Sequence, residues 1–191
     1  MKRRRMICIN ILLLLVITAM ANDSYSKNYN LPNQNSKQYI LSEKEKIDIS
    51  KMILDDTTDY GMTKKEIMES IIAERIKLND KNLLHLVISI SSSFFCGASG
   101  GNCTMWLVER DGNDYKVLLE TNGQVINLEK TKTNGYMDIS FPSHMGRDSR
   151  FREEQIIAVF KFDGSQYKTA ECWTAINGVK KKRTKCGPEY Q

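Results

Sequence analysis

The sequence lacks the short motifs that mark several classes of catalytic and metal site. It has no Cys-x-x-Cys pair, and its one match to the Gly-x-Ser-x-Gly pattern of serine hydrolases, at residues 97–101, lies between Cys96 and Cys103 in a loop that a disulfide would close. The glycine-rich stretch 97–101 does not end in the Gly-Lys-Ser/Thr of a phosphate-binding loop. The two histidines, His85 and His144, do not lie at zinc-ligand spacing from any cysteine. We therefore expect no metal, no cofactor and no recognisable catalytic residue.

Some polar residues offer alternatives to this expectation. Ser143, His144 and Asp148 supply the residue types of a serine-hydrolase triad, but side chains this close in sequence rarely form one. Two acidic groups could act as paired carboxylates in glycoside hydrolysis, namely Asp55, Asp56 and Asp59, and Glu153 and Glu154. Most such groups are solvated surfaces or helix ends, and the sequence does not place any two of them at the required separation.

The start of the chain has the three parts of a cleavable signal peptide. Basic residues 2–5 precede an apolar run at 6–16, and residues 19–21 form a small-x-small cleavage pattern. The apolar run is shorter than the roughly 20 residues that span a bilayer, although an uncleaved anchor is the alternative. We predict cleavage after Ala21 and a periplasmic or secreted protein. The membrane is then met only during export.

The mature chain would carry almost no net charge. The full sequence has 28 Lys and Arg against 23 Asp and Glu, but four of the basic residues lie in residues 1–21. The remainder holds 24 basic and 23 acidic residues, so the basic balance belongs mostly to the precursor. Nucleic-acid binding is indicated by the charge of the folded domain, and we do not expect it here.

Cleavage also removes one of the five cysteines. Those that remain are Cys96, Cys103, Cys172 and Cys186, and an even number in an exported chain predicts disulfides rather than a free catalytic thiol. We favour the pairs Cys96–Cys103 and Cys172–Cys186, because short local loops cost the least entropy to close. One long-range bridge between the two halves of the chain is the alternative.

The mature chain is predicted to contain a leader followed by one domain. Residues 22–40 are rich in Asn, Ser, Gln and Lys, which indicates a flexible leader. Residues 41–191 are enough for a single domain with its own core, and hardly enough for two.

Two helices are predicted between residues 42 and 79. Ser42 with Glu45, and Thr63 with Glu66, have the spacing of capping boxes. Apolar residues recur at helical spacing after each box, and those after the second form a broad stripe: Ile67, Met68, Ile71, Ile72 and Ile76. A stripe this wide must pack on something, most simply on the face of a sheet.

The pattern from residue 83 to residue 191 is that of strands. Leu84, Leu86, Ile88 and Ile90 alternate with less apolar residues and predict a strand with one apolar face. Further strands are predicted at 104–110, 115–120, 124–129, 136–141, 156–162 and 167–175, with a polar loop at 142–154. We predict an α+β fold, with two N-terminal helices packed on an antiparallel meander sheet of about six or seven strands, stapled by disulfides.

Turn motifs between residues 95 and 170 resemble those of small secreted β domains of bacteria. The motifs are Cys96-Gly-x-x-Gly-Gly-x-Cys103, Trp106-Leu-Val, Asp111-Gly-x-x-Tyr, Thr133-Asn-Gly-Tyr-x-Asp-Ile139 and Asp163-Gly-x-x-Tyr. Their hairpins are similar to the blades of FG-GAP-type repeat proteins. The chain lacks the dense acidic loops by which such blades bind calcium, so the resemblance implies an architecture and no metal site.

The most distinctive polar segment lies near the C-terminus. Its basic residues are Lys180, Lys181, Lys182, Arg183 and Lys185, inside the loop that a Cys172–Cys186 bridge would close. The segment is interpreted either as a solvated basic turn or as a constrained cationic loop that contacts an acidic protein, lipid headgroups or cell-wall polymer. Trp173 is either a contact anchor or a core residue that covers the disulfide.

Together these features predict a monomeric, non-catalytic binding domain of the bacterial envelope. Because no catalytic site is recognised in the sequence, we expect the domain to act by binding. We favour an inhibitor or immunity-type protein whose partner is another envelope protein. A cell-wall-acting hydrolase and a structural envelope component are the alternatives.

Overall fold

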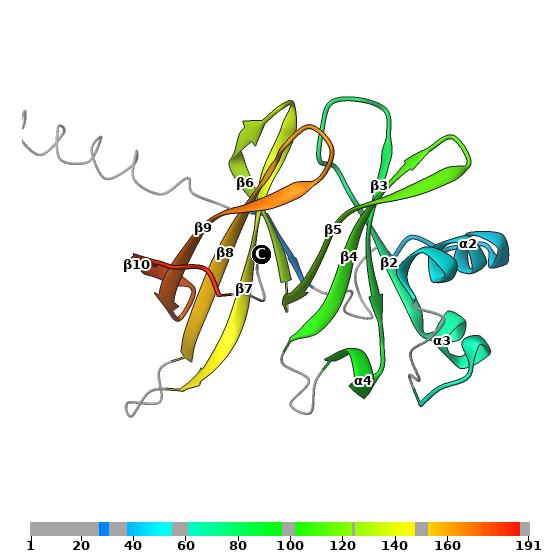
Figure 1. Ribbon diagram of the computed structural model, residues 1–191, viewed down its shortest axis with the longest axis horizontal. Coiled ribbons are helices and arrows are strands. Elements are labelled where there is room, and N and C mark those ends of the chain that lie inside the picture. Colours follow the sequence, from blue (N-terminus) through cyan, green and yellow to red (C-terminus); the bar gives the residue numbers. More distant parts are fainter. Residues whose placement is uncertain are drawn as a thin grey trace, which may run out of the picture.

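The computed structural model describes residues 27–30, 38–54, 61–96, 102–123, 125–147 and 153–187 of the 191-residue chain, and the predicted signal peptide lies outside them. The elements are β1 (Lys27–Asn30), α2 (Glu43–Ile53), α3 (Lys64–Ser70), β2 (Ile71–Ile76), β3 (Leu84–Ile90), α4 (Ser93–Cys96), β4 (Cys103–Asp111), β5 (Asp114–Gly123), β6 (Val125–Thr133), β7 (Tyr136–Arg147), β8 (Glu153–Phe162), β9 (Tyr167–Ile176) and β10 (Val179–Thr184). They form two antiparallel sheets, in the order β1-β6-β7-β8-β9-β10 in sheet A and β2-β3-β4-β5 in sheet B. Figure 1 shows sheet A on the left, sheet B in the middle, and α2 and α3 on the right.

Both predicted capping boxes begin helices. The Ser42 hydroxyl accepts a hydrogen bond from the Glu45 backbone N–H at 3.3 Å, and the Thr63 hydroxyl accepts one from the Glu66 N–H at 3.3 Å. Each glutamate accepts in return from the backbone N–H of its cap residue at 2.8 Å. The boxes satisfy N–H groups that have no partner within the first helical turn. The two helices pack on sheet B through an apolar cluster that includes Leu41, Ile49, Ile67, Leu86, Ile88 and Trp106.

The second helix is shorter than the sequence predicts. Helix α3 ends at Ser70, and Ile71–Ile76 form strand β2, which pairs with β3. The helical prediction was therefore wrong for the second half of the isoleucine stripe. Isoleucine favours strands, and pairing with a strongly apolar neighbouring strand overrides a weak local preference for helix.

The predicted single meander is in fact two sheets packed face to face. In β3, Leu86 and Ile88 face the helices, whereas Val87 faces sheet A together with Met105 of β4. The interior strands of sheet B are therefore buried on both faces, and the chain crosses to sheet A between β5 and β6. The layers are helices, sheet B and sheet A, with one apolar core on each side of sheet B.

Sheet A also has longer strands than the sequence predicts. Strand β7 continues to Arg147 and β8 begins at Glu153, so much of the predicted loop 142–154 is strand, and residues 148–152 lie outside the described part. Pro142 favoured a loop because proline cannot donate a hydrogen bond to a ladder. Among the described pairs, the β6–β7 ladder ends at Ser140, and Pro142 pairs only with Ile157 of β8. Proline is tolerated here because the strand needs no hydrogen bond toward β6 at this position.

Part of the predicted leader takes part in the fold. Residues 27–30 form β1, which pairs with β6. Gln38 forms a bridge with Glu74 of β2, and the Tyr39 backbone N–H donates to the Ala73 carbonyl at 2.9 Å. The chain before α2 therefore covers part of the edge of sheet B at β2.

A buried polar cluster links the two sheets. The Nε2 of His85 lies 2.9 Å from Glu109 Oε2, and it donates because a carboxylate only accepts. The Tyr136 hydroxyl, from sheet A, donates to the same oxygen at 2.6 Å. Burial and the Glu109 carboxylate raise the pKa of Tyr136 to about 12, so its hydroxyl keeps the proton that it donates. His85 is only 1% exposed, so water cannot easily replace these hydrogen bonds. They therefore fix the position of Tyr136 of sheet A against Glu109 of sheet B.

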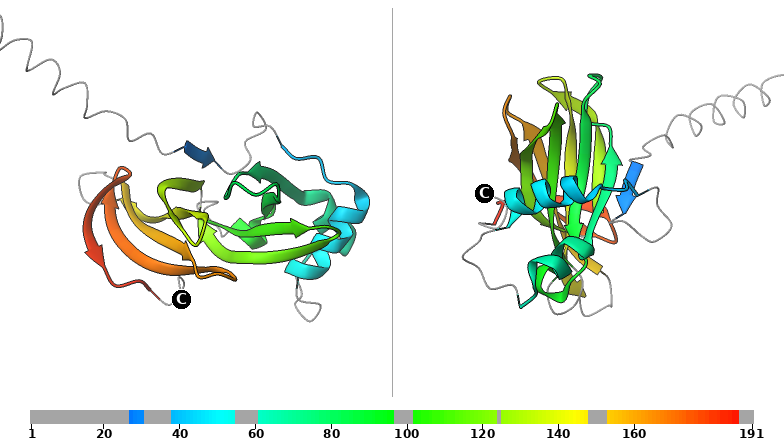
Figure 2. Two further views of the ribbon diagram at one scale, coloured as in Figure 1. Left: turned by 90° about the horizontal axis from the view of Figure 1, so that it is seen from above. Right: turned by 90° about the vertical axis from the view of Figure 1, so that its right-hand side faces the viewer.

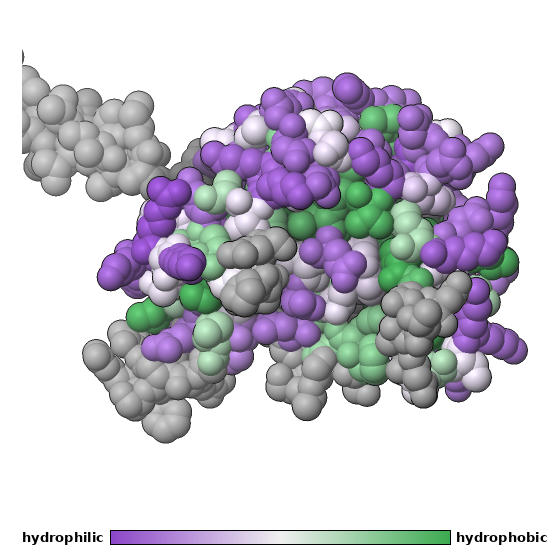
Figure 3. Space-filling model, viewed as in Figure 1, coloured by the Kyte–Doolittle hydropathy of each residue, from purple (hydrophilic) through white to green (hydrophobic). Residues whose placement is uncertain are grey.

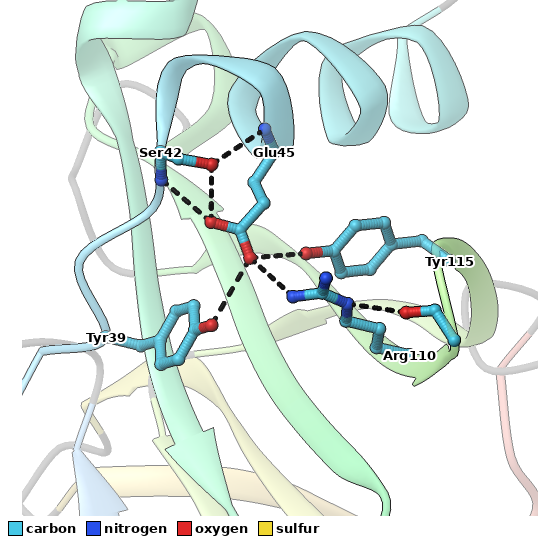
Figure 4. A network of polar contacts seen from close by, with 6 residues as sticks. Tyr39, Ser42, Glu45, Arg110 and Tyr115 are labelled. Atoms are coloured by element: carbon cyan, nitrogen blue, oxygen red, sulfur yellow. Dashed lines mark hydrogen bonds and ion pairs between the residues drawn. The ribbon is translucent and has the colours of Figure 1, made fainter.

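Figure 4 shows a second polar network, which holds α2 on the β4–β5 hairpin. Glu45 Oε1 accepts from Arg110 Nη1 at 2.8 Å, from the Tyr115 hydroxyl at 3.0 Å and from the Tyr39 hydroxyl at 3.2 Å. Burial raises the pKa of Glu45, but hydrogen bonds from Ser42, Tyr115 and Tyr39 outweigh it and lower the pKa to about 2. One carboxylate therefore both caps α2 and attaches it to sheet B.

Acid should destabilise this fold in two pH windows. Burial lowers the pKa of His85 below its usual 6.5 and outweighs the opposite effect of Glu109, so the unfolded chain takes up that proton more readily. Stability should therefore fall as the pH drops below about 6.5. Glu45 adds a second loss between its usual pKa of 4.5 and about 2. Urea unfolding at a series of pH values measures both losses.

Histidine variants separate the upper window from general acid effects. His85→Gln should flatten the dependence of stability on pH between about 7.5 and 5.5, whereas His144→Gln, which changes the other histidine, should retain it. The assignment would be wrong if His85→Gln kept the slope of the unaltered protein.

Candidate binding surface

The predicted basic loop is a strand. Residues Val179–Thr184 form β10, which pairs with β9 through a two-residue turn at Asn177 and Gly178. These turn residues have positive φ angles of 50° and 76°, as the common two-residue hairpin requires. Lysine is depleted in strands, so the local sequence favoured a loop. The hydrogen bonds that β9 supplies decide the conformation instead.

The basic side chains of this hairpin face solvent. Lys180, Lys181, Lys182, Arg183 and Lys185 are all exposed. Lys180 Nζ lies 3.6 Å from Glu129 Oε1, but the other four cations form no ion pair with any described residue. Figure 3 shows hydrophilic residues beside pale and apolar ones on the left side of the molecule, where β10 lies. The strand therefore concentrates positive charge on a nearly neutral domain, and within the described residues only Lys180 has an acidic partner.

The Lys180–Glu129 pair also shows that sheet A is strongly curled. Glu129 lies on β6 and Lys180 on β10, with β7, β8 and β9 between them. In a flat sheet four strand spacings would amount to about 19 Å, farther than the two side chains can reach. Figure 2 shows the curvature of the sheet from above. The curvature brings β10 close to β6 and places β10 at one end of the molecule.

A disulfide fixes the C-terminal end of the basic strand. Both predicted pairs are confirmed, Cys96–Cys103 and Cys172–Cys186. Cys172 is fully buried in β9, and Thr184 of β10 lies directly opposite it. The basic segment is thus held by the Asn-Gly turn at one end and the bridge at the other, which reduces the entropy that it would lose on binding. Two disulfides also suggest an oxidising, extracytoplasmic environment.

Trp173 does not cover the disulfide in the core. Successive residues of a strand point to opposite faces, so Trp173 lies on the face of sheet A opposite to that of Cys172. It stands directly between Ile157 of β8 and Arg183 of β10, and its indole N–H donates to Glu171 Oε2 at 3.1 Å. The indole is half-buried, so an aromatic surface adjoins the basic strand. Its role as a contact anchor stays a prediction.

The residues considered for catalysis do not come together in the described part of the chain. Ser143 and His144 are neighbours on β7, so their side chains point to opposite faces, and the Ser143 hydroxyl donates to the Asn122 carbonyl at 3.2 Å. Glu153 and Glu154 begin β8. Asp148 and the acidic residues between 55 and 59 lie outside the described residues. The described residues include no group of three or more His, Cys, Asp or Glu that could hold a metal ion.

Two features of the surface were not predicted from the sequence. One is that the basic residues form an edge strand, and the other is that Glu129 partly compensates Lys180. The Asn177-Gly178 pair was an available signal for the first, because Asn-Gly between two strands is a strong hairpin signature. Nothing local to residue 129 indicates its contact with residue 180, since three strands separate them.

No protein-family model, curated protein or solved structure matches the chain. The resemblance of its turn motifs to small secreted β domains therefore stays a prediction. None of the helices in the described ranges is long and apolar enough to cross a membrane. The function has to be argued from the surface itself, because a fold alone does not specify an activity.

Proposed function

We propose that the protein is an exported, non-catalytic domain of the bacterial envelope that binds another envelope protein, as an inhibitor or immunity-type partner. The observation that supports this best is β10, an exposed strand on which Lys181, Lys182 and Arg183 have no acidic partner among the described residues. Such a patch attracts an acidic surface and accelerates its association. The two disulfides agree with export.

The expected contribution of the basic patch is moderate. An exposed ion pair contributes about 0.2–1 kcal/mol, so three pairs together are worth about tenfold in affinity. Because exposed charges are screened by salt, the contribution should be largest at low ionic strength. The disulfide and the hairpin turn add to it by holding the cations in place before binding.

Replacing three cations of β10 should weaken capture of the partner about tenfold at low salt. The triple variant is Lys181→Gln, Lys182→Gln and Arg183→Gln, which leaves the Lys180–Glu129 pair intact. The immobilised mature protein and this variant are incubated with envelope extract from the source organism. Quantitative mass spectrometry then compares the proteins that each retains, and an activity assay of the retained partner tests inhibition.

The matched control removes three cations at the other end of the molecule. Lys44, Lys51 and Lys64 are exposed residues of α2 and α3, on the opposite side from β10 in Figures 1 and 2. Their replacement by glutamine lowers the net charge equally and should leave capture unchanged. The proposal loses its support if no retained protein distinguishes the two triple variants, or if vesicles of anionic lipid compete fully for the same surface.

A further inference from the structure

The backbone of β10 forms one edge of sheet A among the described strands. This strand is last in the strand order, and in the described part of the chain it pairs only with β9. An edge strand presents a row of N–H and C=O groups that another strand can pair with. Ile176 and Val179 flank the two-residue turn and exchange backbone hydrogen bonds. Hydrogen-bonded and non-hydrogen-bonded pairs alternate along an antiparallel ladder, so the N–H and C=O groups of the next residue, Lys180, point away from β9.

We propose that the partner presents an acidic, extended segment that joins sheet A as a further strand beside β10. This inference rests on the proposed function and names the chemistry and geometry of the contact. Main-chain hydrogen bonds would supply affinity, and the side chains of β10 would select the sequence of the added strand.

The placement of the cations specifies the sequence of that segment. Residues directly opposite each other in neighbouring strands share a face of the sheet. Arg183 lies opposite Trp173, whereas Lys182 lies opposite Thr174, so these two cations are on different faces. The register shift inserts Lys181 as an extra residue between the regular pairs. A complementary strand therefore needs carboxylates on both faces, which means consecutive Asp or Glu residues.

The same charges exclude the simplest competing occupant, a second copy of this chain. Two β10 strands side by side would bring lysines and arginines of both copies together, and like charges opposite each other destabilise a sheet. Lysine on an edge strand is a common protection against self-association. An acidic strand meets no such repulsion, so the edge discriminates between the two occupants.

A pair of synthetic peptides tests strand addition. Each peptide is acetylated at its N-terminus and amidated at its C-terminus. In each sequence, pairs of consecutive glutamates are separated by valine and threonine. In one of them, alternate backbone amides are N-methylated, which removes hydrogen-bond donors and leaves the charge unchanged. NMR titration of the labelled mature protein at low salt should show shifts centred on β10, with the methylated peptide binding at least about tenfold more weakly. Hydrogen exchange of the outward β10 amides should slow only with the unmodified peptide.

The outcomes separate this inference from the proposed function. Equal affinity for the two peptides, or no binding of the unmodified one, would overturn strand addition. The proposed function would still stand in that case if the β10 triple variant lost its envelope partner. Tighter binding of β10 to anionic lipid vesicles than to the unmodified peptide would also overturn the inference, because the surface would then recognise charge without an extended backbone.

Discussion

Replacing Cys172 and Cys186 with alanine should lower the free energy of unfolding by about 3 kcal/mol. The bridge joins residues separated by 14 positions, and Cys172 is fully buried in the core between the sheets. Without the bridge, the unfolded chain recovers conformational entropy, and alanine leaves a small gap where the sulfur packed. Urea unfolding followed by circular dichroism measures the change.

The other disulfide supplies the matched control for this prediction. Replacing Cys96 and Cys103 with alanine opens a bridge of sequence separation 7, and the same entropy relation gives a loss of about 2.5 kcal/mol. The two variants should differ in binding more than in stability. Only the Cys172 and Cys186 variant releases the end of β10, so only that variant should weaken capture of the envelope partner. If either double variant lost less than about 1 kcal/mol in its free energy of unfolding, the stabilising role assigned to that disulfide would be contradicted.

Replacing Glu109 with leucine should cost about 3 kcal/mol of stability, because two buried donors lose their acceptor. The His85 ring N–H and the Tyr136 hydroxyl both bond to Glu109 Oε2, and both residues are buried. No water reaches them easily, so each is left with an unmet hydrogen bond. Chemical denaturation of the purified variant gives the difference.

Two further variants make this prediction specific. Glu120→Leu changes an exposed glutamate on the neighbouring strand β5 and should shift stability by less than about 0.5 kcal/mol. Adding Tyr136→Phe to Glu109→Leu should recover part of the loss, because it removes one of the two orphaned donors. If Glu109→Leu and Glu120→Leu had equal effects, the cluster would not link the sheets in the way described.

Local patterns in the sequence predicted the elements whose determinants lie close together. Ser42 and Glu45 are three residues apart, so the capping box that starts α2 is a property of one helical turn. The hairpin between β4 and β5 follows from Asp111-Gly112, where Gly112 adopts a φ of 64°. The two disulfides follow from loop entropy, which favours short closures.

Predictions failed where a distant segment decides the conformation. Ile71 and Ile72 stand at helical spacing, yet they form β2 because β3 is available as a pairing partner. The lysines of β10 have little strand propensity, and β9 determines their conformation through the backbone. His85 was expected on the less apolar face of a half-buried strand, but it is almost fully buried because sheet A covers that face.

The sequence alone determined the helix starts and most of the strands of this protein, and it favoured the disulfide pairs that the structure contains and an extracytoplasmic compartment. Each of these depends on neighbouring residues or on short loops, whose energetics can be read along the chain. Only the tertiary structure decided that the strands divide into two sheets, that Glu109 joins them, and that the basic segment is an exposed edge. These features depend on which faces meet, and burial and hydrogen-bond pairing between distant residues outweigh the weak local preferences.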